Sequence, residues 1–89
     1  MAQIQIPKSL TKFVGGSTNL ILDCKQLNEL GHCLQSSYPD FYTTVYDTVH
    51  CPKKFVCFYL NSTLIKDFTS SIVINDQDII EILIAISGG

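Results

Sequence analysis

One stretch of this sequence has the repeat of an amphipathic helix, and it limits the folds that the chain can adopt. Apolar or small residues recur there at helical spacing and form a single stripe: Cys24, Leu27, Leu30, Gly31, Leu34 and Tyr38. A single amphipathic helix cannot bury its stripe alone, so it must lie across one face of a sheet. The sequence therefore predicts an α+β protein with one main helix.

Both ends of this helix have local signals. Asp23 is followed three residues later by Gln26, which is the pattern of a capping box, in which each side chain binds the other residue's free backbone N–H. At the other end, Pro39 disfavours helical backbone in Tyr38, the residue before it. We therefore expect the helix to be capped by Asp23 and to end at Tyr38.

The strands that this helix needs are predicted on both sides of it. Alternation, β-branched residues and turn residues indicate strands at residues 3–6, 17–22, 55–60, 63–65 and 78–86. The first two are expected to pair antiparallel, whereas the helix crossover allows the first and last strands to pair in parallel. Residues 39–54 are expected to form a loop with a short helical turn at 40–42.

The last predicted strand has five isoleucines, whose stiff χ1 angles disfavour helix. Because successive side chains of a strand point to opposite faces, the residues of this segment divide into two sets. Ile80, Ile82 and Ile84 point one way. Ile79, Glu81, Leu83 and Ala85 point the other way.

Length and charge exclude several classes of protein. The chain has 89 residues, 46% of them hydrophobic and only 16% charged, which is typical of one globular domain. We expect a single domain over residues 1–89, with residues 85–89 as a flexible C-terminal tail. The formal net charge is −2 and the basic residues are scattered, so no nucleic-acid binding is expected.

The compartment follows from what the sequence lacks. Its start does not have the pattern of a signal peptide, and its longest apolar run is far too short to span a membrane. We therefore expect a cytoplasmic protein with no membrane partner. In that compartment the four cysteines, Cys24, Cys33, Cys51 and Cys57, are expected to be reduced thiols without an assigned role.

The histidines do not indicate a metal site. Each of them precedes a cysteine, as His32-Cys33 and His50-Cys51, but the chain has no close pair of ligands such as C-x-x-C. His32 and Cys33 also point about 100° apart on a helix. No metal site is expected.

The sequence "ISGG", residues Ile86, Ser87, Gly88 and Gly89, follows the last strand directly. It permits two interpretations, a frayed end without a role or a terminal carboxylate that is itself the working group. A carboxylate on two glycines has no side chain beside it, so it can pass through a narrow channel into another enzyme's active site. ATP can activate it there as an acyl-adenylate.

Three stretches of the chain resemble one protein family. They are "IQIPKSLTKFVGG", "FVCFYLNSTLI" and "INDQDIIEILIAISGG", which are similar to the family's first strand and loop, its third strand and asparagine turn, and its last strand and tail. The family is that of the β-grasp sulfur carrier proteins, in particular the molybdopterin synthase small subunit and the carrier that feeds cysteine synthesis. The resemblance implies a ubiquitin-like fold, with a mixed sheet of four to five strands and one main helix on one face.

The resemblance also implies a mechanism and a set of partners. An E1-like adenylyltransferase would activate the carboxylate of Gly89 with ATP, and a desulfurase or rhodanese-type donor would convert it to a thiocarboxylate. The large subunit of molybdopterin synthase, or its counterpart in cysteine or thiamine synthesis, would then take the sulfur. The chain itself would be a carrier with no catalytic residue and no bound cofactor. Family members dock through apolar residues of an exposed sheet face, and the corresponding positions are Pro7, Leu64 and Leu83.

Three alternatives stay open from the sequence. Molybdopterin synthesis is the first expectation for the pathway, and cysteine or thiamine synthesis is the alternative. A ubiquitin-like modifier would use the same Gly89 carboxylate to form an isopeptide bond with a lysine. An interaction domain would not use the tail at all.

Overall fold

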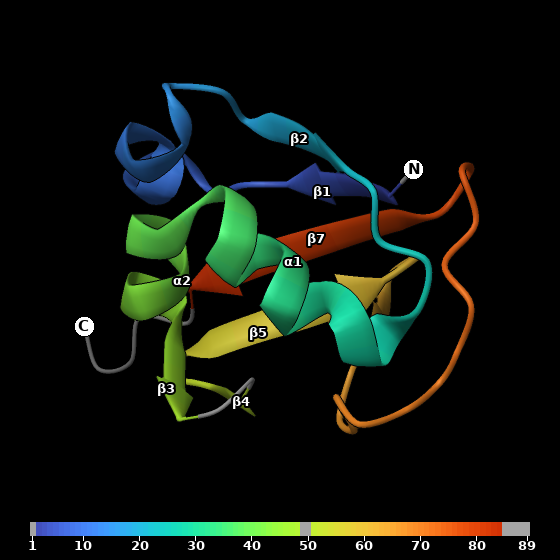
Figure 1. Ribbon diagram of the computed structural model, residues 1–89. Helices are drawn as coiled ribbons and strands as arrows, with labels where there is room; N and C mark the ends of the chain where they lie inside the picture. Colours follow the sequence, from blue (N-terminus) through green and yellow to red (C-terminus); the bar gives the residue numbers. More distant parts are fainter. Residues whose placement is uncertain (1, 49–50, 85–89) are drawn as a thin grey trace.

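The structure, a computed structural model, describes residues 2–48 and 51–84 (Figure 1). These residues contain a five-stranded sheet in the order β2-β1-β7-β5-β6. Its strands are β1 (Ala2–Gln5), β2 (Asn19–Leu22), β5 (Val56–Leu60), β6 (Thr63–Leu64) and β7 (Ile79–Ile84). β1 pairs in parallel with β7, and the other neighbours pair antiparallel. The predicted mixed sheet is confirmed, and the first and last strands pair in parallel, which the helix crossover allows.

β7 is the central strand, and its side chains alternate between the buried and the exposed face of the sheet. Ile80 and Ile82 are fully buried, whereas Ile79 and Leu83 are exposed. The division predicted from the sequence is therefore confirmed for the residues of β7. Residues 85 and 86, which the sequence also assigned to this strand, lie outside the described part of the chain.

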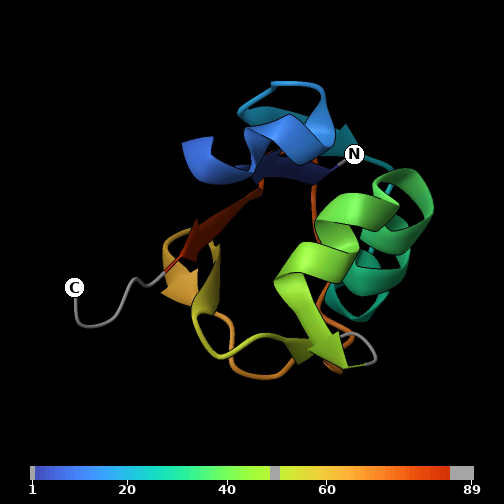
Figure 2. The same ribbon diagram turned by 90° about the vertical axis from the view of Figure 1, so that its left-hand side faces the viewer.

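The helices cover one face of this sheet. α1 (Leu30–Ser37) follows a 3-10 turn, η2 (Leu27–Glu29), and α2 (Pro39–Val45) follows α1 directly. Figure 2 shows both green helices on the same side of the strands. The largest fully buried side chains come from both layers: Phe41, Phe58, Ile4, Leu30, Leu34, Ile80, Ile82, Val45 and Cys24. The apolar stripe of the main helix is thus buried against the sheet, as predicted.

The predicted start of the main helix is wrong by three residues. Asp23 is not the cap, because the N-cap is Gln26 and the capping box joins Gln26 to Glu29. The Gln26 backbone N–H donates to the Glu29 carboxylate at 3.1 Å. The reason lies in a distant segment: the backbone of Lys25 accepts from Ile74 at 2.8 Å, and Gln26 bridges Val73. These contacts keep Gln26 extended, so the helix begins only after it.

Residues 39–54 contain more regular structure than the expected loop. α2 extends over seven residues, and a separate hairpin of β3 (Tyr46–Thr48) and β4 (Cys51–Pro52) follows it. Pro39 occupies the first turn of α2, where its missing N–H costs nothing, so the proline that ends α1 also starts α2. Phe41 and Val45 lie one turn apart on α2 and are both fully buried. Tertiary packing therefore makes this segment helical.

The segment between β1 and β2 packs on the core. It forms a 3-10 helix, η1 (Lys8–Val14), in which Leu10 and Val14 are buried. Gly15 and Gly16 end it with φ angles of 71° and 85°, the left-handed region that favours glycine.

Replacement of the observed cap tests the corrected helix start. Glu29→Ala removes the acceptor of the Gln26 N–H, so we expect the free energy of unfolding to fall by about 0.5–1.5 kcal/mol. Asp23→Ala is the matched control, an exposed carboxylate at the cap position that the sequence predicted, and it should change the free energy by less than about 0.5 kcal/mol. Urea denaturation of both variants measures this. The reverse ranking would contradict the Gln26 cap.

Candidate functional site

The face of the sheet opposite α1 and α2 carries a group of apolar side chains. Leu64 and Leu83 are each 42% exposed on this face. The cross-strand register places Leu83 beside Cys57 and Leu64 beside Tyr59, so β5 connects the two leucines. Cys57 and Tyr59 are half-buried. We call Leu64, Leu83, Cys57 and Tyr59 the open-face patch.

The structure brings two of the three predicted docking residues together. Leu64 and Leu83 belong to the open-face patch, on strands that flank β5. Pro7 lies on the other side of β7, where it is half-buried and caps η1. Gln5 pairs with Glu81, and Pro7 and Leu83 each follow two residues later. Pro7 therefore lies at the same end of the sheet as Leu83 but outside the patch.

Phe55, two residues before Cys57 in sequence, is an exposed aromatic residue that the sequence analysis did not single out. Its side chain is 46% exposed and directly precedes β5, whose first residue, Val56, pairs with Ile84 at the end of β7. The sequence contains only a weak signal for it, because Phe55 lies in the turn before β5, where strand alternation does not fix the direction of a side chain.

A tight turn between β5 and β6 positions Leu64. Asn61 and Ser62 form it with φ angles of 49° and 71°. The Asn61 amide donates to the Asp78 carboxylate at 2.9 Å and accepts from the Ile79 N–H at 2.9 Å. The Asn61 backbone N–H donates to the Ile79 carbonyl, also at 2.9 Å. One side chain therefore connects the turn to the start of β7.

The Asp78 carboxylate, which accepts a hydrogen bond from the Asn61 amide, is held in its charged form. The backbone N–H of Asn75 donates to Asp78 at 2.8 Å, and this bond, followed by the Asn61 amide, holds the pKa of Asp78 below its ordinary value of 3.8. The turn between β5 and β6 and the turn before β7 are thus joined through one ionised group.

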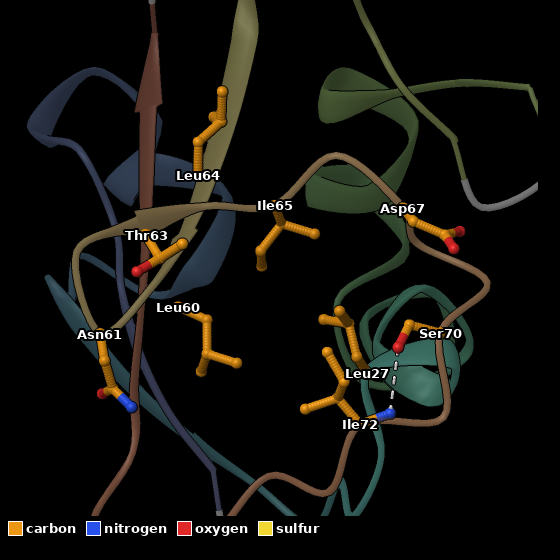
Figure 3. Close-up of a pocket in the computed structure, with 9 residues that line it drawn as sticks. All are labelled: Leu27, Leu60, Asn61, Thr63, Leu64, Ile65, Asp67, Ser70 and Ile72. Atoms are coloured by element: carbon orange, nitrogen blue, oxygen red, sulfur yellow. Dashed lines mark hydrogen bonds between the residues drawn. The ribbon is translucent and has the colours of Figure 1, made fainter.

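An apolar hollow of about 560 Å³ lies at the β6 edge of the sheet (Figure 3). Leu27, Leu60, Ile65 and Ile72 point into it, whereas Leu64 points away. Two of the polar groups around it have partners within the fold: Ser70 accepts from the Ile72 N–H, and Asp67 accepts from the Thr69 N–H.

The predicted tail, Ile86, Ser87, Gly88 and Gly89, lies outside the described residues. Among residues 2–48 and 51–84, no group of three or more histidine, cysteine or acidic side chains is arranged to hold a metal ion. Within the same two ranges, no helix has the length and apolar character needed to cross a membrane.

No protein-family model matches the chain, and no curated protein matches its sequence. Solved structures do match. CysO of Mycobacterium tuberculosis, described as an antigen, is 21% identical over 97% of this chain and 100% of its own, with a TM-score of 0.80. A chain of the BexX/CysO complex of Amycolatopsis orientalis is 18% identical over 100% of both chains, with a TM-score of 0.82.

SAMP1 from Haloferax volcanii is more distant in sequence. It is 12% identical over 99% of this chain and 98% of its own, with a TM-score of 0.71. At these identities the comparisons establish the fold. The chain has the ubiquitin-like β-grasp fold that the resemblance implied.

The turn that positions Leu64 can be tested with two glycine substitutions. Asn61→Gly accepts the positive φ angle but loses both side-chain hydrogen bonds, so we expect the free energy of unfolding to fall by about 1–2 kcal/mol. Ser62→Gly is the matched control, because it relieves positive φ without removing a contact from β7. It should leave the stability unchanged or raise it by up to about 1 kcal/mol. Urea denaturation distinguishes these outcomes, and equal effects would contradict the role of the Asn61 amide.

The Asp78 interaction predicts a pH dependence. Because the folded-state pKa of Asp78 is lowered, its stabilisation is present above the unfolded pKa and is lost as the pH falls through the folded value. The difference in unfolding free energy between the wild type and Asp78→Asn should therefore be constant at neutral pH and shrink below about pH 4. Urea denaturation between about pH 3 and 7 measures it. A difference independent of pH would mean that the carboxylate charge has no role.

Proposed function

We propose that the chain is a sulfur carrier, with the carboxylate of Gly89 as the group that carries sulfur. An E1-like enzyme uses ATP to adenylate this carboxylate and releases pyrophosphate. A desulfurase or rhodanese-type donor then supplies sulfur, AMP leaves, and a thiocarboxylate is formed. The chain binds no cofactor in this scheme and does no catalysis, because its partners supply the chemistry.

The observation that carries this proposal is the combination of the fold with the position of Gly88-Gly89 in the sequence. The central strand, β7, ends at Ile84, and the two glycines follow after three further residues. The structural neighbours with this fold are of the sulfur-carrier and ubiquitin-like type. Glycines offer a carboxylate without neighbouring side chains, as a narrow active-site channel requires.

The sulfur acceptor is a biosynthetic enzyme. Molybdopterin synthase, through its large subunit, is the acceptor that the sequence resemblance favours, and enzymes of cysteine or thiamine synthesis are the alternatives. A chain of this fold forms part of the BexX/CysO complex, which supports binding to a second protein.

The open-face patch is the proposed docking surface for the E1-like enzyme. Leu83 lies on β7, the strand that precedes the diglycine in sequence, and Leu64 extends the surface across β5. Half-buried Pro7 borders it at the same end of the sheet. Because α1 and α2 cover the opposite face, a partner can contact these residues without displacing a helix.

Intact mass tests the carrier chemistry. After incubation with an E1-like enzyme, ATP and a sulfur donor, we expect a mass gain equal to the replacement of one oxygen atom by sulfur. A variant that lacks Gly89 is the first control and should show no gain. Omission of ATP is the second control, because the carboxylate must be activated before sulfur can replace its oxygen.

Two results would contradict the proposal. No mass gain with an enzyme that loads another carrier under the same conditions would exclude this chain as its substrate. A series of amide-linked conjugates on lysines would identify a ubiquitin-like modifier.

Docking can be tested separately from loading. Leu83→Ala and Leu64→Ala should each raise the KM of adenylation roughly tenfold with little change in kcat, because each removes an apolar contact of the complex. Ile21→Ala is the matched control. Ile21 is 52% exposed but lies on β2, separated from β7 by β1, so its replacement should change KM less than about twofold. Equal KM values for all three variants would place docking elsewhere and leave the carrier chemistry standing.

A further inference from the structure

Two cysteine side chains meet where the helix layer begins, away from the open-face patch. Cys24 lies two residues after β2, and Cys33 is the fourth residue of α1. The Cys33 thiol donates to the carbonyl oxygen of Asp23 at 3.7 Å, and Asp23 directly precedes Cys24. The fold thus brings together two thiols that are nine positions apart in the sequence.

The surroundings of the two thiols differ. Cys24 is 2% exposed, and its thiol donates to the Gln26 carbonyl at 3.3 Å. Burial raises the pKa of Cys24 to about 12, and the adjacent Cys33 thiol adds to this rise through its charge and a hydrogen bond. Cys33 is only half-buried and lines a surface hollow of about 400 Å³ together with Lys25 and His32. A reagent in solution can therefore reach Cys33 but not Cys24.

We propose that Cys24 and Cys33 form a redox-responsive pair, which a low-molecular-weight disulfide oxidises to an intramolecular disulfide. Both thiols are free in the structure. Their order of reaction follows from two features, the proximity of the two thiols and the difference in their access to solvent. Cys33 reacts first with the reagent, and Cys24 resolves the product.

The reaction balances as two thiol–disulfide exchanges. The Cys33 thiolate attacks one sulfur of the reagent, the reagent's S–S bond breaks, and one reagent thiol leaves. Cys24 then loses its proton and attacks the Cys33 sulfur, which expels the second reagent thiol. The protein loses two protons and two electrons, equal to two hydrogen atoms, and the reagent gains them. The Cys33 thiol lies within hydrogen-bonding reach of Cys24. This proximity compensates for the small thiolate fraction of Cys24, because the second step needs no collision in solution.

Equilibration with reduced and oxidised glutathione distinguishes an intramolecular disulfide of this pair from ordinary modification of a single thiol. Each intramolecular disulfide releases two glutathione thiols for one glutathione disulfide consumed. At a fixed ratio of the two forms, tenfold dilution of total glutathione should therefore raise the ratio of protein disulfide to dithiol about tenfold. A mixed disulfide depends on the glutathione ratio alone, so its abundance should not change. Cys57, half-buried on the open face, is the internal control for such a mixed disulfide.

The partners of the bond are identified by intact mass and tryptic mapping after acid quenching and alkylation. Trypsin places Cys24 in residues 13–25 but leaves Cys33 and Cys51 together in residues 26–53. We expect a species lacking two hydrogen atoms, with these two peptides linked. The link should persist in Cys51→Ser and disappear in Cys33→Ser, in which a hydroxyl can still donate to the Asp23 carbonyl.

Three results would overturn the proposal. They are a link that is lost in Cys51→Ser, oxidised product that does not respond to dilution, and a stable mixed disulfide on Cys33 beside an unreacted Cys24. Each means that Cys24 does not resolve Cys33. None of them affects the proposed loading of Gly89, which is measured independently.

Discussion

The rest of the structure depends on the parallel pairing of β1 with β7. It joins the two ends of the described chain at the centre of the sheet, where Ile4 and Ile80 pair and are both fully buried. Parallel neighbours require a crossover connection, and here the crossover contains α1 and α2. Because both helices pack on the face that carries these isoleucines, the other face is left for Leu83 and Leu64. The exposed apolar surface is thus a consequence of the topology.

β7 combines three roles that follow from its place in the sheet. Its inward side chains, Ile80 and Ile82, form the core, and its outward Leu83 belongs to the open-face patch. Its first residue, Ile79, is held by the Asn61 amide, which also fixes the turn before Leu64. The strand is therefore braced at the end opposite to the one that leads to Gly88-Gly89 in sequence. In the proposed function, a rigid strand with a docking side chain is what presents the tail to a partner, since the carrier itself performs no catalysis.

The features predicted from the sequence are those set by local periodicity. The alternation of residues 79–84 and the helical stripe from Leu27 to Leu34 are repeats that survive folding because each matches one buried face. The features missed depend on contacts between distant residues. The start of the main helix is set by residues 72–74, which hold Lys25 and Gln26 extended against the capping pattern. α2 is stabilised by burial of Phe41, and no local pattern shows that a helix will find a core there.

The site residues divide in the same way, into those that local periodicity indicated and those that it did not. Leu83 was placed on the open face by alternation alone, whereas Leu64 came only from the family resemblance, because its short strand has too few residues to show a period. The proximity of Cys24 and Cys33 could not be read from the sequence, since it requires the three-dimensional path between β2 and α1.

The two proposed activities lie in different layers of the fold. A partner bound to the open-face patch would cover Cys57 but leave Cys33 accessible, so oxidation of the pair is compatible with a docked carrier.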